Sequence, residues 1–320
     1  MQKDRIEWID FLRGVFMVMI LVFHTEVYYK EYSVTPYYIY VTNAIILFYF
    51  LSGYLFHRNR PFNLKAKLAS IVKSLLFPYF VFTLLISIAK LLFLKEGRGW
   101  SEMFISIISG RASWFIAALI VAEVLFSVLL FISKGKQWWL STVALLCLII
   151  YYLIPFNQHN YWQWQDALLA VTFLYAGYTY HQYEDVINRI HKPLYSLLLF
   201  LILILIKVYE YHVDLPMRNI SVECAPLFLC DALVTILFVI GLIRLIPRCH
   251  LIEWTGRHCI VYYFLCGGCP LIASRVLVRF GIDYDGMFLR FILALILTYA
   301  LNTCLTWIIF RYFPFIVKIK

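Results

Sequence analysis

Arg13 and His24 are the two residues whose types and spacing most directly suggest chemistry. They stand at the ends of ten apolar or glycine residues in the stretch FLRGVFMVMILVFHTE, residues 11–26. On an α-helix, eleven positions make about three turns plus roughly 20°, so both side chains share one face, roughly 16 Å apart along the axis. Ionisable groups are costly in an apolar span, so this aligned pair indicates a function.

The pair suits proton transfer next to an anionic ligand. A neutral imidazole can take a proton from a hydroxyl group, because its pKa lies near working pH. An arginine can hold a negative group or a carbonyl without losing its charge. Asp10, three residues before Arg13, can pair with it across one turn. The alternative is that His24 is a satisfied interior histidine with no chemistry.

Further carboxylates also fall within apolar stretches, and they leave two interpretations open. Glu26 points about 200° away from His24 on the same helix, so it cannot simply orient that ring. Glu123 and Asp231 lie inside later apolar stretches. Glu26 and Glu123 either make structural hydrogen bonds between helices, or they orient the histidine or bind a substrate.

The composition indicates which elements must position these residues. Of the 320 residues, 63% are hydrophobic and 14% are charged, whereas soluble domains are about half apolar and about a quarter charged. We therefore expect an integral membrane protein, an all-α polytopic bundle of about ten transmembrane helices, since a span needs roughly 20 helical residues. The predicted spans are 8–29, 37–57, 69–94, 114–133, 138–155, 166–181, 193–211, 224–246, 258–278 and 288–312.

The distribution of basic residues predicts the orientation. With the N-terminus inside, Lys and Arg are enriched in the cytoplasmic segments, which favours both termini in the cytoplasm. The first span is interpreted as a retained helix rather than a signal peptide, because it carries Arg13 and His24. The most basic loop, HRNRPFNLKAK at 57–67, either marks topology or docks a phosphorylated cytoplasmic ligand. The net charge of +10 is attributed to the Lys and Arg of the cytoplasmic segments, and no nucleic-acid-binding motif accompanies it.

Neither a metal site nor a tightly bound cofactor is expected. Cys266 and Cys269 form a CxxC motif inside a hydrophobic stretch without histidine or acidic company, and free cysteine commonly behaves as a small buried hydrophobe. The predicted outer loop NQHNYWQWQD, 157–166, combines aromatic and amide groups that suit a sugar. The alternative for this loop is an interfacial aromatic belt.

Five segments, in order, resemble acyltransferase family 3, whose members are membrane enzymes that acylate glycans and other acceptors. The first, RIEWIDFLRGVFMVMILVFH at 5–24, carries the family's motif of arginine, ten residues and histidine, which maps onto Arg13 and His24. The others are FYFLSGYLF at 48–56, KSLLFPYFVF at 73–82, WFIAALIVAEVLF at 114–126 and WTGRHCIVYYFLCG at 254–267. The chain departs from the family where Lys73 alone precedes Pro78 closely, and where Cys259 and Cys266 replace the usual serine and histidine.

The resemblance implies one membrane acyltransferase domain, 1–320, which moves an acetyl or other short acyl group from cytoplasmic acyl-CoA to a hydroxyl of a surface glycan or lipid-linked saccharide. His24 is the expected general base or transient acyl carrier, with Glu123 and Glu26 as further catalytic residues. Acetyl-CoA is expected as a donor substrate. Substrate-binding roles are expected for Arg13, Asp10, Ser52, Gly53, Arg58, Arg60, Lys73 and Trp114. For Ser52 and Gly53, close helix packing is the favoured alternative.

We expect a multi-pass protein of the cell membrane, the cytoplasmic membrane in a bacterium, surrounded by lipid and without a nucleic-acid partner. Whether it forms a homo-oligomer stays open. The alternative function is a transporter or flippase of the glycan or the acyl donor, and a non-catalytic partner of glycan assembly is a third. Neither repeat symmetry nor paired broken helices, the usual signs of transporters, are evident in the sequence.

Overall fold

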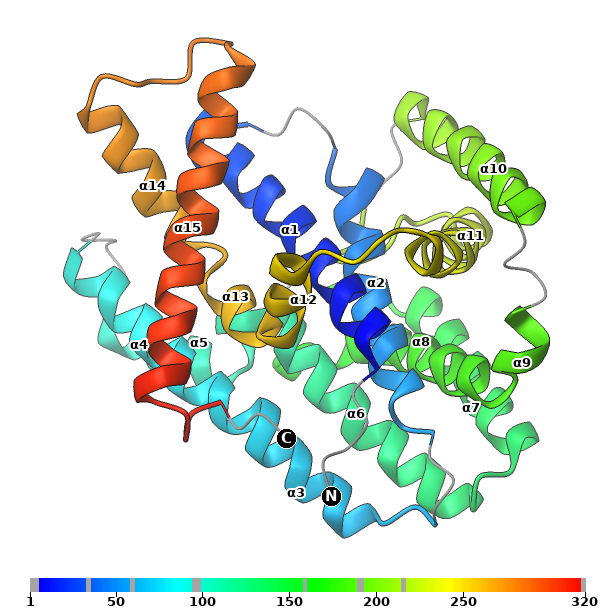
Figure 1. Cartoon of the computed structure of the whole chain (residues 1–320). Coiled ribbons are helices and arrows are strands. Elements are labelled where there is room, and N and C mark those ends of the chain that lie inside the picture. Colours follow the sequence, from blue (N-terminus) through cyan, green and yellow to red (C-terminus); the bar gives the residue numbers. More distant parts are fainter. Residues whose placement is uncertain are drawn as a thin grey trace. The chain divides into compact units, whose positions relative to one another are not determined.

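The computed structural model describes residues 6–32, 36–57, 61–93, 99–157, 160–188, 193–213 and 217–317 (Figure 1). It is 82% helical, and no strand forms within these ranges. The extended residues Met217 and Val222 form an isolated bridge. The predicted all-α fold class is therefore confirmed.

The helices form two compact units, which are described separately. The first unit comprises Met1–Ile45, Arg189–Pro216 and Pro226–Pro314, and the second comprises Ile46–Asn188, Met217–Ala225 and Phe315–Lys320. Helix α2 (Tyr37–Tyr54) contributes residues to both units. A single acyltransferase domain across 1–320 stays a prediction.

Helices occur at each of the ten apolar stretches that the sequence predicts. Those long and apolar enough to cross a membrane are α1 (Glu7–Lys30), Leu64–Leu91, Arg111–Ser133, α10 (Pro193–His212), α11 (Ala225–Leu245) and α15 (Phe288–Tyr312). The pair α13 (Cys259–Leu265) and α14 (Gly268–Arg279), bent by 51°, makes a seventh if it counts as one span. The chain is thus a multi-pass membrane protein, while the count of about ten and the orientation of the termini are not confirmed.

Three predicted spans form helices that do not reach the length or hydropathy of a span. Helix α7 (Gln137–Leu153) has 17 residues. Helix α2 has 18 residues, among them five tyrosines, Thr42 and Asn43. Helix α8 (Trp164–Gln182) carries glutamines, threonines and Asp166. Because such polar groups lower the mean hydropathy, apolar runs alone overestimate the number of spans that meet both criteria.

Within the first unit, α1 packs against α12 (His250–Arg257) (Figure 1), and one glycine of each helix lies at their contact. A Cβ atom at Gly14 would lie 1.9 Å from the backbone oxygen of Ile252, and one at Gly256 would lie 1.7 Å from that of Asp10. Only residues without a side chain let two helix backbones approach this closely. The crossing therefore fixes the N-terminal part of α1, where Arg13 lies.

Within the second unit, α6 (Trp114–Ser133), α7 and α8 pack together, and α3 (Leu64–Ile71) packs on α6. The C-terminal part of α2 crosses α8 at another pair of glycines. A Cβ atom at Gly53 would lie 1.9 Å from the backbone oxygen of Leu174, and one at Gly177 would lie 1.9 Å from that of Phe50. The crossing requires a residue as small as glycine at position 53, in agreement with the packing alternative for this residue.

The third predicted span begins earlier than the hydropathy suggests. Asn63 caps α3 by accepting a hydrogen bond from the backbone N–H of Ala66 at 2.9 Å, so the helix starts at Leu64. The helix continues through a π-helical turn, Val72–Leu76, into α4 (Phe77–Phe93). Pro78 has no N–H to donate to the preceding turn, and π-helical segments occur mostly as single wide turns of this kind inside α-helices.

The segment Met217–Ala225 holds the end of α7. The Arg218 guanidinium donates to carbonyl oxygens that the helix end leaves unpaired, with the shortest bond, 2.6 Å, to Tyr151. Asn219 donates to Asp166 at 2.9 Å, and the hydroxyl groups of Ser221 and Tyr151 are hydrogen bonded at 2.9 Å. These bonds join the segment to both α7 and α8.

Candidate functional site

Helix α1 is continuous from Glu7 to Lys30, so it presents Arg13 and His24 on one face, as their spacing predicts. Both side chains are half-buried. The centroid of the His24 ring lies 5.6 Å from that of Phe23 and 6.4 Å from that of Tyr28. Within the described part of the chain, neither Arg13 nor His24 makes a hydrogen bond or an ion pair. Both groups are therefore available to a ligand.

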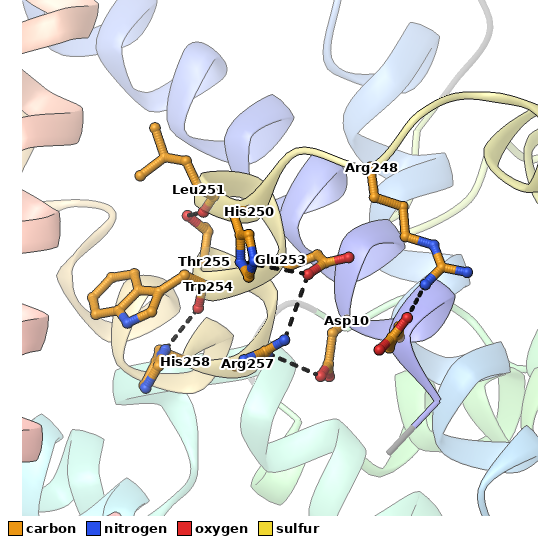
Figure 2. Close-up of polar contacts among 10 residues, drawn as sticks. Asp10, Arg248, His250, Leu251, Glu253, Trp254, Thr255, Arg257 and His258 are labelled. Atoms are coloured by element: carbon orange, nitrogen blue, oxygen red, sulfur yellow. Dashed lines mark hydrogen bonds and ion pairs between the residues drawn. The ribbon is translucent and has the colours of Figure 1, made fainter. Parts of the chain in front are cut away.

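Asp10 pairs with α12 rather than with Arg13. Its Oδ2 atom lies 3.5 Å from Nε of Arg257, whose Nη2 lies 3.5 Å from Oε2 of Glu253 (Figure 2). Both carboxylates are buried. Figure 2 shows Arg257 between the two acidic side chains. The expected pairing of Asp10 with Arg13 is thus replaced by a bond between helices, which leaves the Arg13 charge uncompensated by Asp10.

Glu26 and Lys30 form a buried pair near the other end of α1. The distance from Lys30 Nζ to Glu26 Oε1 is 3.9 Å, and the ammonium group lies 4.3 Å from the centre of the Phe291 ring. The second carboxylate oxygen, Oε2 of Glu26, is buried and accepts no hydrogen bond from the described residues. Buried polar atoms are seldom left unpaired, so this oxygen is a candidate for binding a substrate hydroxyl.

The structure brings two predicted site residues of the second unit together, Ser52 of α2 and Glu123 of α6. The Ser52 hydroxyl donates to Oε1 of Glu123 at 2.8 Å. The other oxygen, Oε2, is bound by the ammonium group of Lys67, also at 2.8 Å. Both oxygens of the buried Glu123 carboxylate are thus bound by groups from neighbouring helices, which offsets the cost of burying its charge.

A pocket of about 860 Å³ opens beside this pair. It is lined by Lys67, by Lys134, and by apolar and small polar side chains that include Phe56, Phe62, Asn63, Ser70, Leu130, Phe131 and Tyr178. Its size falls within the range of small-molecule sites. The pocket is lined by residues 61–63 and 134–135, which belong to two different segments predicted to be cytoplasmic. These two segments therefore lie on the same side of the second unit.

The remaining predicted substrate-binding residues make few contacts or lie outside the described residues. Lys73 is exposed in the π-helical turn. Trp114, half-buried at the start of α6, makes an edge contact with Phe115, with ring centroids 6.1 Å apart. Arg58 and Arg60 lie outside the described residues. His24 and Glu26 belong to the first unit and Glu123 to the second, and each set is described within its own unit.

The predicted acceptor loop uses its amide groups internally. Gln165 Nε2 donates to the carbonyl of Pro155 at 3.0 Å, and Asn160 Nδ2 lies 3.2 Å from Oε1 of Gln163. Tyr161 and Trp164, by contrast, are exposed by 74% and 42%. Among the described residues of the loop, these two rings are therefore groups that a sugar or the membrane interface can reach.

Sequence reasoning missed three basic partners, Arg257, Lys67 and Lys207. Lys207 of α10 lies 2.8 Å from Oδ2 of Asp231 and 3.0 Å from Oε2 of Glu210, and both carboxylates are buried. The signal for Lys207 was present, because an ionisable residue inside an apolar span indicates a partner in another span.

Within the described residues, no group of three or more His, Cys, Asp or Glu side chains is arranged to hold a metal ion. Cys266 and Cys269 are buried free cysteines at the bend between α13 and α14. Cys259, which replaces the family's usual serine, begins α13, and α13 contacts α1. The segment 254–267, the last of the five that resemble the family, therefore contacts α1 within the first unit.

Comparison with known proteins identifies the family. A sequence profile of acyltransferase family 3, described as an acyltransferase domain, matches residues 6–311, nearly the whole chain. This confirms the resemblance of the five segments. No curated protein and no solved structure matches the chain.

Proposed function

Because the chain belongs to acyltransferase family 3, we propose that it transfers an acetyl or other short acyl group from acyl-CoA to a hydroxyl of a surface glycan or lipid-linked saccharide. The observation that carries this proposal is the pair Arg13 and His24, aligned on α1 and without polar partners among the described residues. Ionisable groups left unpaired in a membrane helix are expected to serve a ligand.

In the proposed reaction, His24 acts as the general base. It takes the proton of the acceptor hydroxyl while the hydroxyl oxygen attacks the thioester carbonyl. The carbon–sulfur bond then breaks, and the departing CoA thiolate recovers the proton from the imidazolium. Arg13 binds a negative or carbonyl group of the donor, a task for which its charge and its planar array of donors are suited.

The donor's phosphates are proposed to bind at the pocket of the second unit. Lys67 and Lys134 supply positive charge there, and the aromatic walls suit the flat adenine ring of CoA. The acceptor is proposed to meet the exposed rings of Tyr161 and Trp164, because sugars pack on aromatic faces. Membrane lipid covers the remaining apolar surface of the spans.

The test uses the full chain in lipid vesicles, with labelled acetyl-CoA and a panel of saccharide acceptors. We expect CoA release in the wild type and its loss in His24→Ala. The matched control is His250→Ala, since His250 lies in the same unit with a side chain 96% exposed, and this variant should retain turnover. Labelled acetyl trapped on the protein, and absent from His24→Ala, would identify a transient acyl carrier instead of a base.

Two outcomes would contradict the proposal. If His24→Ala released CoA at the wild-type rate, the histidine would have no part in the chemistry. If folded wild-type protein neither bound nor consumed acyl-CoA but moved a glycan across the vesicle membrane, the transporter alternative would replace the enzyme.

A further inference from the structure

Lys67 stands at the boundary between the pocket and the buried Glu123–Ser52 pair. Lys67 lines the pocket, and its ammonium group binds Oε2 of Glu123 at 2.8 Å and lies 3.8 Å from the centre of the Phe56 ring. The Lys67 side chain is 23% exposed, whereas that of Glu123 is 9% exposed. Lys67 therefore binds a buried carboxylate and is also part of the wall of a pocket that a ligand can enter.

In the empty protein, the charge of Lys67 is compensated by Glu123 and not by a ligand. Lys67 is the one cation bound to Glu123 within the described residues, so that carboxylate largely neutralises the charge of Lys67, whereas Lys134 also lines the pocket. An ammonium group carries three donors, and the described contacts of Lys67 use a single one on a carboxylate oxygen. The other donors can reach an anion in the pocket without a change of helix positions.

We propose that Lys67 is shared between two anions, Glu123 in the empty protein and a phosphate group of the acyl donor in the loaded protein. This inference rests on the proposed function for the identity of the ligand. Ser52 keeps its hydrogen bond to Oε1 while the Lys67 ammonium turns toward the pocket. Glu123 is then a competitor that lowers the affinity of the pocket for phosphate.

Such competition suits a transferase whose donor and product carry the same phosphates. A pocket that bound them very tightly would also retain the product CoA, and release of product limits many enzymes. Because Glu123 opposes donor and product equally, it lowers the binding that does not contribute to the chemical step. Glu123 thereby acts on turnover through Lys67, as a positioning residue rather than a group that contacts the substrate.

The experiment measures CoA binding to the full chain in lipid nanodiscs by titration calorimetry. Glu123→Gln keeps an oxygen for Ser52 and removes the charge, so CoA should bind about three- to tenfold more tightly. Lys67→Gln should weaken binding by a similar factor. In the double variant, Glu123→Gln should have no further effect, because it acts through Lys67. The matched control is Lys136→Gln, an exposed lysine near the pocket that does not line it, and it should leave binding little changed.

The outcomes separate this inference from the proposed function. Weaker or unchanged CoA binding in Glu123→Gln, with weakened binding in Lys67→Gln, would overturn the sharing of Lys67 while leaving the acyl donor in place. If CoA did not bind the wild type but pyrophosphate bound with the same dependence on Glu123 and Lys67, the sharing would stand and the donor would be wrong. Should Glu123→Gln fail to fold, Glu123→Asp withdraws the carboxylate from Lys67 and should also tighten binding.

Discussion

The glycine crossing of α1 and α12 predicts that one added methyl group will disturb both stability and activity. In Gly256→Ala, the new Cβ atom would lie 1.7 Å from the backbone oxygen of Asp10, whereas ordinary contacts lie at 3.4–4 Å. The obstacle is backbone, so no side-chain rotation relieves it, and the helices must part by about 1.7 Å. Overpacking of this kind costs about 1–3 kcal/mol, of which the higher helix propensity of alanine recovers at most about 1 kcal/mol.

The assay is equilibrium unfolding of the purified protein in mixed micelles, followed by tryptophan fluorescence, together with CoA release from acetyl-CoA. Gly268→Ala is the matched control, because Gly268 also lies in a helix and a Cβ atom there meets nothing within 4 Å. We expect a lower free energy of unfolding and slower turnover in Gly256→Ala alone. Adding Gly14→Ala should cost less than it does by itself, since the helices have already separated. Equal stability of Gly256→Ala and Gly268→Ala would refute the reasoning.

Two further predictions concern charged and titratable groups elsewhere in the chain. Lys207→Met leaves the buried carboxylates of Asp231 and Glu210 without their cation, so the free energy of unfolding should fall by about 3–5 kcal/mol, and adding Asp231→Asn should restore part of it. His57 follows the end of α2 at Tyr54 and lies outside the helices long and apolar enough to cross a membrane, and burial together with the neighbouring His181 lowers its pKa below the ordinary 6.5. As pH falls below 6.5 the unfolded chain binds this proton first, so thermal stability should decrease there, and less steeply in His57→Asn; an equal pH dependence in both proteins would count against the buried environment of His57.

The sequence was informative about single helices and much less so about the contacts between them. The periodicity of α1 placed Arg13 and His24 on one face, and this depends on nothing outside the helix. The partner of Asp10 could not be predicted in the same way, because Arg257 reaches it from α12, more than two hundred residues along the chain. The number of spans was not confirmed either, since an apolar run rich in tyrosine, such as α2, forms a helix without meeting the length and hydropathy expected of a span.

The same distinction applies to the Ser52–Glu123 pair of the second unit. Ser52 was selected by resemblance and Glu123 also by its place in an apolar stretch, and only the fold shows that they are hydrogen bonded. Lys67 fell in a predicted cytoplasmic loop, yet the Asn63 cap starts α3 early enough to place it on a helix. A cap acts over three residues and can be identified in a sequence, whereas the docking of that helix on α6 cannot.

The packing of Met217–Ala225 has a practical consequence for producing the protein. Asn219-Ile220-Ser221 is an acceptor sequence for N-linked glycosylation. In the fold, however, the Asn219 amide donates to Asp166, and Ser221 is fully buried against Tyr151. An oligosaccharide attached in the secretory pathway of a eukaryotic host, before folding, would occupy the space that this segment fills. Expression in a host without that modification, or an Asn219→Gln variant made for eukaryotic cells, avoids the conflict.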